Sequence, residues 1–184
     1  MGLTGKSLCR ETFWPTKIVM KRPRFTPVFF LILNLLVAGQ VLHAATVSLL
    51  IVEGGLGEDI SRIEASSAWE GGFMDALFDA GHIACNANMV RQEAGDLPPP
   101  GFGWSEAMEG GADFLALVLL KYVPVPQASR MMPSSVSWRL LDEKGTIVAS
   151  AQDQRLAPTT SSNEDAKNGK DLAKVILVRM RDTR

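Results

Sequence analysis

Cysteine and histidine are nearly absent from this sequence. It holds two of each in 184 residues, and Cys9 and His43 lie among the first 44. Residues 45–184 therefore contain one of each, Cys85 and His82, which excludes an intramolecular disulfide in that part. Zinc sites are built mainly from several Cys and His ligands, so a zinc site is disfavoured too. Residues three apart on a strand point to opposite faces, so the two side chains do not predict a catalytic Cys/His pair.

Signature motifs of common cofactor and hydrolase sites are also missing. The sequence has no Asp-x-Asp-x-Asp calcium loop and no Gly-x-Ser-x-Gly nucleophile elbow. The glycine-rich stretch 53–59 lacks the Gly-Lys-Ser/Thr ending of a phosphate loop, and Ile60 replaces the last glycine of a dinucleotide fingerprint. We interpret it as a mobile turn with Asp59 at a helix start, and we predict no catalytic, cofactor-binding or metal-binding residues.

A short apolar run near the N-terminus predicts export. From Met20 the sequence reads Met-Lys-Arg-Pro-Arg, then 12 residues from Val28 to Gly39, and it ends in small residues at Ala44. This order is typical of a secretory signal peptide, and the run is shorter than the roughly 20 residues that span a membrane. We predict that 20–44 is a cleaved signal peptide. We also predict that translation starts at Met20, so that residues 1–19 precede the true start and are disordered. An uncleaved membrane anchor is the alternative.

Basic residues are outnumbered in the part that follows the predicted signal. Residues 45–184 carry 13 Lys/Arg and 19 Asp/Glu, a net charge of −6. The asymmetry is strongest in 45–113, which has two basic and 12 acidic residues, whereas 114–184 has 11 and seven. Nucleic-acid binding depends on Lys and Arg that contact phosphate, so we exclude a nucleic-acid partner. Contact with a membrane is expected only through the N-terminal segment, if it is uncleaved.

The apolar pattern predicts one α/β domain over 45–184. Predicted strands cover 46–52, 82–86, 112–123, 136–140 and 146–152. Predicted helices cover 59–80, 105–109 and the stretch from 163 onward, the last capped by Ser161 or Ser162. The order β-α-β-(α)-β-β-β-α predicts an α/β (α+β) fold with a single mixed sheet of about five strands and two main helices. The continuous apolar run 112–123 is expected at its centre.

Two local features concern the helix predicted over 59–80 and the environment of Cys85. Gly71 and Gly72 interrupt the helix predicted over 59–80, which is either two pieces, the second starting near Ser67, or one helix packed closely at its glycines. Cys85 stands in an apolar stretch, where a free cysteine behaves as a small hydrophobe, so we expect it in the core.

The layout resembles a group of small bacterial envelope modules typified by the amino-terminal domain of TolB, the curli secretion protein CsgG and the penicillin-binding-protein activator LpoB. Two stretches carry the resemblance: Gly-Phe-Met-Asp-Ala-Leu-Phe-Asp-Ala-Gly-His over 72–82 and Gly-Ala-Asp-Phe-Leu-Ala-Leu over 111–117. It spans most of residues 46–181 and implies a non-enzymatic role in the cell envelope.

Two proline-rich loops, 97–104 and 124–133, are the longest excursions of the predicted domain. Loops of this length in a compact domain are uncommon unless they bind something, and Met, Arg and aromatic residues are enriched at recognition surfaces. We predict that the two loops form a partner-facing surface. The predicted partner-binding residues are Phe102, Trp104, Arg130, Met131 and Met132.

These features favour an exported, periplasmic, non-catalytic module that binds an envelope protein or a cell-wall component. The alternative is a small exported hydrolase that acts on envelope glycan through carboxylates of Glu70, Asp75 and Asp79. Asp75 and Asp79 are one helical turn apart, which is more typical of a solvated helix face.

Overall fold

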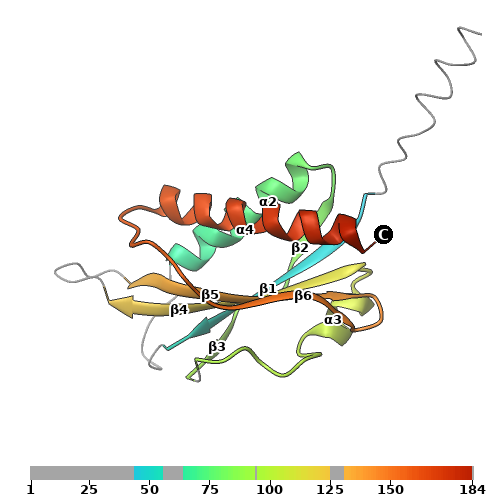
Figure 1. Ribbon diagram of the computed structural model, residues 1–184, viewed down its shortest axis with the longest axis horizontal. Helices are drawn as coiled ribbons and strands as arrows, with labels where there is room; N and C mark the ends of the chain where they lie inside the picture. The colour runs from blue at the N-terminus through green and yellow to red at the C-terminus, as the bar shows by residue number, and fades with distance from the viewer. Residues whose placement is uncertain (1–43, 56–63, 94, 125–130, 184) are drawn as a thin grey trace, which may run out of the picture. The chain divides into compact units, whose positions relative to one another are not determined.

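The computed structural model of the protein describes residues 44–55, 64–93, 95–124 and 131–183. All of them belong to one compact unit, residues 42–184. The described residues form one six-stranded mixed sheet and three helices (Figure 1). The predicted α/β class with a single mixed sheet is confirmed. None of the helices in the described ranges is long and apolar enough to cross a membrane.

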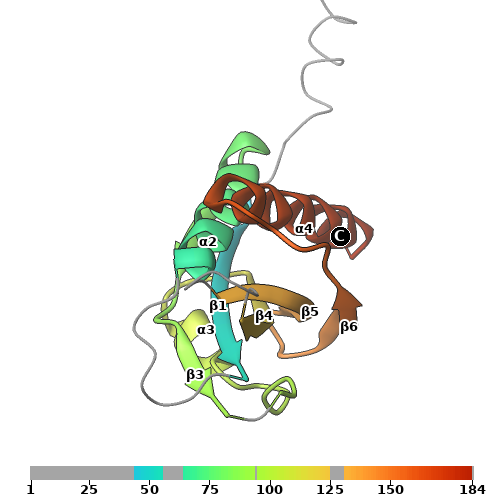
Figure 2. The same cartoon turned by 90° about the vertical axis from the view of Figure 1, so that its left-hand side faces the viewer.

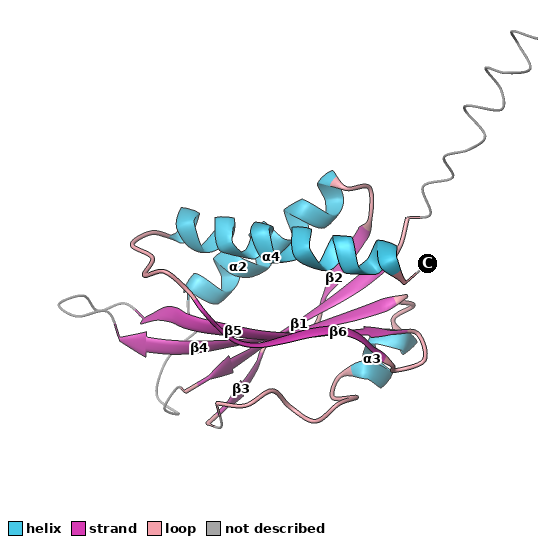
Figure 3. Ribbon diagram, viewed as in Figure 1, coloured by secondary structure: helices cyan, strands magenta, loops and turns pink. Residues whose placement is uncertain are grey.

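The sheet has the order β2-β1-β4-β5-β6. Figure 3 shows its strands in magenta, with the two long helices on one side. The strands are β1 (Thr46–Gly54), β2 (Ile83–Asn86), β3 (Val90–Gln92), β4 (Phe114–Pro124), β5 (Met131–Asp142) and β6 (Ile147–Arg155). Strand β1 is parallel to β2, β3 and β4, whereas β4, β5 and β6 are antiparallel neighbours. Strand β4 lies in the middle, as predicted from its unbroken apolar run, and seven consecutive residues at its start are buried.

Strand β3 was not predicted from the sequence. It is three residues long and pairs with the last residues of β1. Strand β2 pairs with the first residues of β1 along the same edge. Three residues with partly exposed side chains give no hydrophobic periodicity, which explains why the pattern missed it.

Strand β5 begins earlier than predicted, so Met131, Met132 and Pro133 belong to a strand and not to the loop assigned to them. Proline interrupts most strands, but here it pairs opposite Tyr122, where the register between β4 and β5 shifts. A bulge is one of the few places where a strand accepts proline. Residues 125–130, including Arg130, lie outside the described ranges.

Helices α2 (Glu64–Asp79) and α4 (Ser162–Asp182) cover one face of the sheet, and the short α3 (Trp104–Glu109) covers part of the other (Figures 1 and 2). Helix α2 runs through Gly71 and Gly72 without a break, so the single-helix alternative is correct. Its predicted start at Asp59 lies outside the described residues. As predicted, Gly81 terminates the helix in the left-handed conformation, with a φ of 79°. The Gly81 and His82 amides donate to the carbonyls of Phe78 and Leu77 in the pattern of a Schellman cap.

Glycine lets α2 and α4 approach each other closely. A Cβ added at Gly72 would lie less than 3.0 Å from the backbone of Ala166, and one added at Gly169 would meet the backbone of Trp69 in the same way. Both glycines are buried in this crossing. Gly169 lowers the helix propensity of α4, and its position at the crossing explains why the sequence tolerates it.

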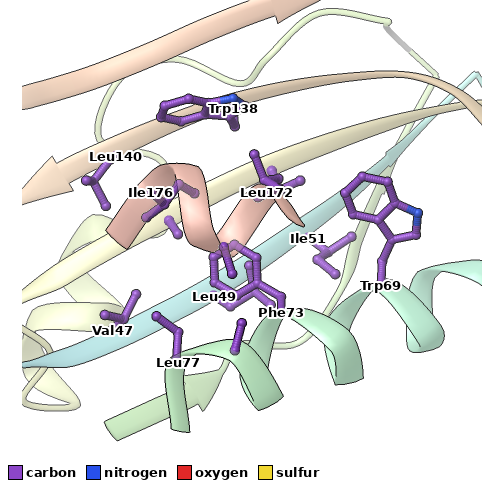
Figure 4. Packing of buried hydrophobic residues seen from close by; sticks show 14 of the residues in the cluster. Val47, Leu49, Ile51, Trp69, Phe73, Leu77, Trp138, Leu140, Leu172 and Ile176 are labelled. Atoms are coloured by element: carbon purple, nitrogen blue, oxygen red, sulfur yellow. The ribbon is translucent and has the colours of Figure 1, made fainter. Parts of the chain in front are cut away.

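The main core lies between the sheet and the two long helices (Figure 4). Trp69, Phe73 and Leu77 on α2 point toward Leu49 and Ile51 of β1. Leu172 and Ile176 of α4 complete the cluster over β4 and β5. A smaller cluster on the opposite face packs α3 against the sheet, chiefly through Leu50, Leu115, Leu117 and Ala107.

The C-terminal elements follow the sequence prediction. The hairpin of β5 and β6 turns at Gly145, whose φ is 74°, which favours glycine. The Ser161 side chain caps α4 by accepting a hydrogen bond from the Glu164 amide at 3.4 Å. Ser161 is therefore the capping residue of the two that the sequence left open.

Candidate functional site

An apolar groove lies on the α3 face of the sheet, between α3 and the edge formed by β2 and β3. We call it the α3 groove; its volume is about 590 Å³, and its walls include Leu50, Cys85, Val90, Phe102, Glu106 and Ala107. Phe102 is 38% exposed, although a phenyl ring is normally buried. A concave, mainly apolar site with few polar groups is the usual form of a binding pocket.

Two residues hold α3 in place beside this groove. Gly103 has a φ of 72°, and a Cβ there would lie 2.5 Å from Cδ2 of Leu50, so any other residue at this start of the helix would be strained and would displace the Leu50 side chain. Trp104 donates its indole N–H to the Asp142 carbonyl at 3.1 Å, and its ring lies against Gly145. The helix is thereby fixed both to β1 and to the turn between β5 and β6.

The structure separates the predicted partner-facing residues into two groups. Phe102 faces the α3 groove, and Trp104 beside it is half-buried and has the anchoring role described above. Met131 and Met132 are half-buried at the other end of β5, where Met131 packs against the main core. Trp104 contacts Asp142, the last residue of β5, whereas Met131 is its first. Strands rise about 3.4 Å per residue, so the two ends of this 12-residue strand are more than about 30 Å apart. Met131 and Met132 therefore lie apart from Phe102 and Trp104, whereas Arg130 and the rest of residues 125–130 lie outside the described residues.

Cys85 lies in the wall of the α3 groove and is half-buried, so it is not the core residue that the sequence predicted. Its Sγ lies 3.7 Å from the Val47 carbonyl oxygen. His82 has a structural contact of its own, because its Nδ1 accepts a hydrogen bond from the Ala45 amide at 3.0 Å. The two side chains contact different parts of the segment that leads into and forms β1.

A second, polar cavity of about 550 Å³ lies on the helix side, at the carboxyl end of β1. At its base, Glu53 is only 2% exposed. The Ser66 hydroxyl donates to Glu53 Oε1 at 2.6 Å, and Arg91 Nε donates to Oε2 at 2.8 Å. Tyr122 Oη lies 2.5 Å from Ser66 Oγ, so the tyrosine hydroxyl donates to the serine. Glu53 is thus a fixed part of β1 and not part of a mobile turn.

One pattern in the sequence indicated where the Glu53 side chain of this hydrogen-bond network lies. Val47, Leu49, Ile51 and Glu53 alternate along β1, and a strand places alternate side chains on one face. Glu53 therefore had to face the helices. Its partner Arg91 gave no local signal, because it lies on the three-residue β3.

The three carboxylates considered for a hydrolase do not converge. Glu70 lines the polar cavity and accepts a hydrogen bond from the Asn86 side chain. Asp75 and Asp79 are exposed on α2, as their helical spacing indicated. Asp79 pairs with Lys170 of α4 at 2.7 Å, and this hydrogen bond raises the pKa of Lys170. In the described part of the chain, no three His, Cys, Asp or Glu side chains are arranged to hold a metal ion.

Comparison with known proteins leaves the family open. No protein-family model matches the sequence, and no curated protein matches it. Among solved structures, a PelC dodecamer variant from Paraburkholderia phytofirmans is 16% identical with a TM-score of 0.43, covering 71% of this chain and 86% of that one. The competence damage-inducible protein A (ComA) of Klebsiella pneumoniae is 11% identical with a TM-score of 0.36, covering 79% and 89%. Likenesses at this level carry no inference about function.

Proposed function

We propose that this chain is an exported, non-catalytic module of the bacterial periplasm that binds another component of the cell envelope through the α3 groove. The observation that carries the proposal is the exposed Phe102 ring in the wall of an open apolar groove. Aromatic side chains are enriched at the buried centre of protein interfaces. The signal-like order of residues 20–44 supports export.

Removing the Phe102 ring should weaken capture of the partner. Phe102→Ser removes an apolar anchor, and we expect a loss of about 1 kcal/mol or more in binding. Phe78 is a matched control, because it is an exposed phenylalanine, 53% accessible, near the end of α2. It neither lines the groove nor belongs to the main core. Pull-down from envelope extract should show a loss for Phe102→Ser and none for Phe78→Ser. Equal retention of the partner by both variants would contradict the proposal.

Export predicts a defined N-terminus. We expect processing near the bond between Ala44 and Ala45, since Ala44 supplies the small residue that signal peptidase requires. The structure is compatible with this cut, because a new ammonium group at Ala45 can donate to His82 Nδ1 as the amide does. Mass spectrometry of the protein in the periplasmic fraction should give an N-terminus at or beside Ala45. An intact terminus at Met1 or Met20 in the membrane fraction would favour the uncleaved anchor.

A carboxylate-dependent hydrolase is a second candidate, since Glu53 and Glu70 line the same cavity. Both oxygens of Glu53 already accept hydrogen bonds from Ser66 and Arg91, so Glu70 would have to act as the general acid. Release of reducing ends from cell-wall glycan, lost in Glu70→Gln, would establish this activity. No turnover by the unmodified protein would exclude it for that substrate.

A further inference from the structure

We propose that the α3 groove takes an apolar side chain from an extended, lysine- or arginine-containing segment of a partner protein. This inference rests on the proposed function and names the chemistry of the partner. Three features of the groove carry it: its apolar walls, its acidic rim and the strand edge beside it.

The walls fit an apolar anchor. Leu50, Val90 and Ala107 form the apolar surface around the Phe102 ring, and the volume of about 590 Å³ lies in the usual range for ligand pockets. Ala107 is 6% exposed and Val90 is half-buried, so both are held by packing. An incoming aliphatic or aromatic side chain would remove more of the Phe102 surface from water, which is favourable.

The acidic residues of α3 favour basic residues on either side of the apolar anchor in that segment. Glu106 is the only charged residue among the wall residues, and Glu109 lies on the same helix. Every charged residue from Leu97 to Asp113 is acidic. A Lys or Arg beside the anchor would face these acidic residues. Such complementary charge speeds association of the partner and fixes the orientation in which it binds. An anionic lipid headgroup or a phosphate would be repelled by the same acidic residues.

The strand edge favours a peptide over an isolated small molecule. Within the described sheet, β2 pairs only with β1, so the other backbone edge of Ile83–Asn86 has no neighbouring strand. Cys85 and Asn86 belong to this strand and also line the groove. An extended segment can therefore hydrogen-bond along β2 while one of its side chains enters the groove, as in strand addition.

The half-buried Cys85 thiol reports on occupancy of the groove. In the Cys9→Ser chain it is the sole cysteine, so its alkylation by iodoacetamide can be followed without interference. The probes are the peptide Lys-Val-Phe-Val-Lys, its counterpart Glu-Val-Phe-Val-Glu, and Lys-Val-Ser-Val-Lys. We expect only the first to slow alkylation, by fivefold or more at saturation. Glu106→Gln, an exposed substitution, should bring the two Phe peptides to within about twofold of each other.

Several results would overturn the inference. Equal protection by the acidic peptide would remove the charge selection. Protection by phosphatidylglycerol vesicles, or concentration-dependent self-protection with a dimer in sedimentation, would assign the groove to lipid or to a second copy. If no peptide protects Cys85 and none binds by fluorescence polarisation, the inference fails, whereas the proposed function stands as long as Phe102→Ser still weakens capture. If free Cys85 proves unreactive, the polarisation measurement alone decides.

Discussion

Gly169→Ala should destabilise the domain by about 3 kcal/mol, although alanine is the better helix former. The added Cβ would meet the backbone of Trp69, which cannot rotate away as the tip of a side chain can. The two helices must then separate, and the buried side chains between them lose contact. Gly72→Ala should cost a similar amount, because its Cβ would meet the backbone of Ala166. Urea denaturation of the purified domain measures both effects.

Gly71 provides the matched control. It adjoins Gly72 on the same helix, yet a Cβ added there would meet nothing within 4 Å. Gly71→Ala should therefore raise the free energy of unfolding by up to about 1 kcal/mol through helix propensity alone. Loss of stability in all three variants, or gain in all three, would show that the helices do not cross at Gly72 and Gly169.

Arg91→Met should cost about 3 kcal/mol, the second large effect that we expect. The change leaves the carboxylate of Glu53, which is 2% exposed, without its counter-charge. Arg91 itself is 37% exposed, so the loss of stability comes from the buried, unpaired carboxylate of Glu53 and not from removal of a buried guanidinium. Urea denaturation curves of the variant and the unmodified protein at pH 7 measure this loss.

Lys121→Met is the control for that experiment. It breaks an ion pair of similar length, 2.6 Å, but the partner Asp153 is 66% exposed and remains solvated. The expected cost is less than about 1 kcal/mol. Equal losses from Arg91→Met and Lys121→Met would mean that burial of Glu53 does not determine the effect.

The sequence predicted the elements that have strong periodicity. Strand β4 and the termination of α2 by Gly81 follow directly from an unbroken apolar run and a left-handed glycine. The sequence-based prediction failed for proline, which occurs both in loops and at bulges of strands. Pro133 signals a loop in isolation, yet a register shift opposite Tyr122 accommodates it in β5.

The candidate site was only partly predictable. Phe102 was selected by composition, and the structure places it in the α3 groove. Met131 and Met132 were selected for the same reason, but they lie at the far end of β5. Proximity between segments distant in the sequence depends on strand order and register, which no local pattern encodes. The groove itself, and the network around Glu53, arise only when β1, β3 and α2 or α3 come together.

Photocrosslinking from the groove tests the central claim most directly. A benzoylphenylalanine would replace Phe102 in one chain and Phe78 in another, both expressed in living cells and irradiated. We predict a discrete adduct with one envelope component from position 102, competed by Lys-Val-Phe-Val-Lys, and none from position 78. Adducts of equal yield from both positions, or from position 78 alone, would contradict binding through the α3 groove.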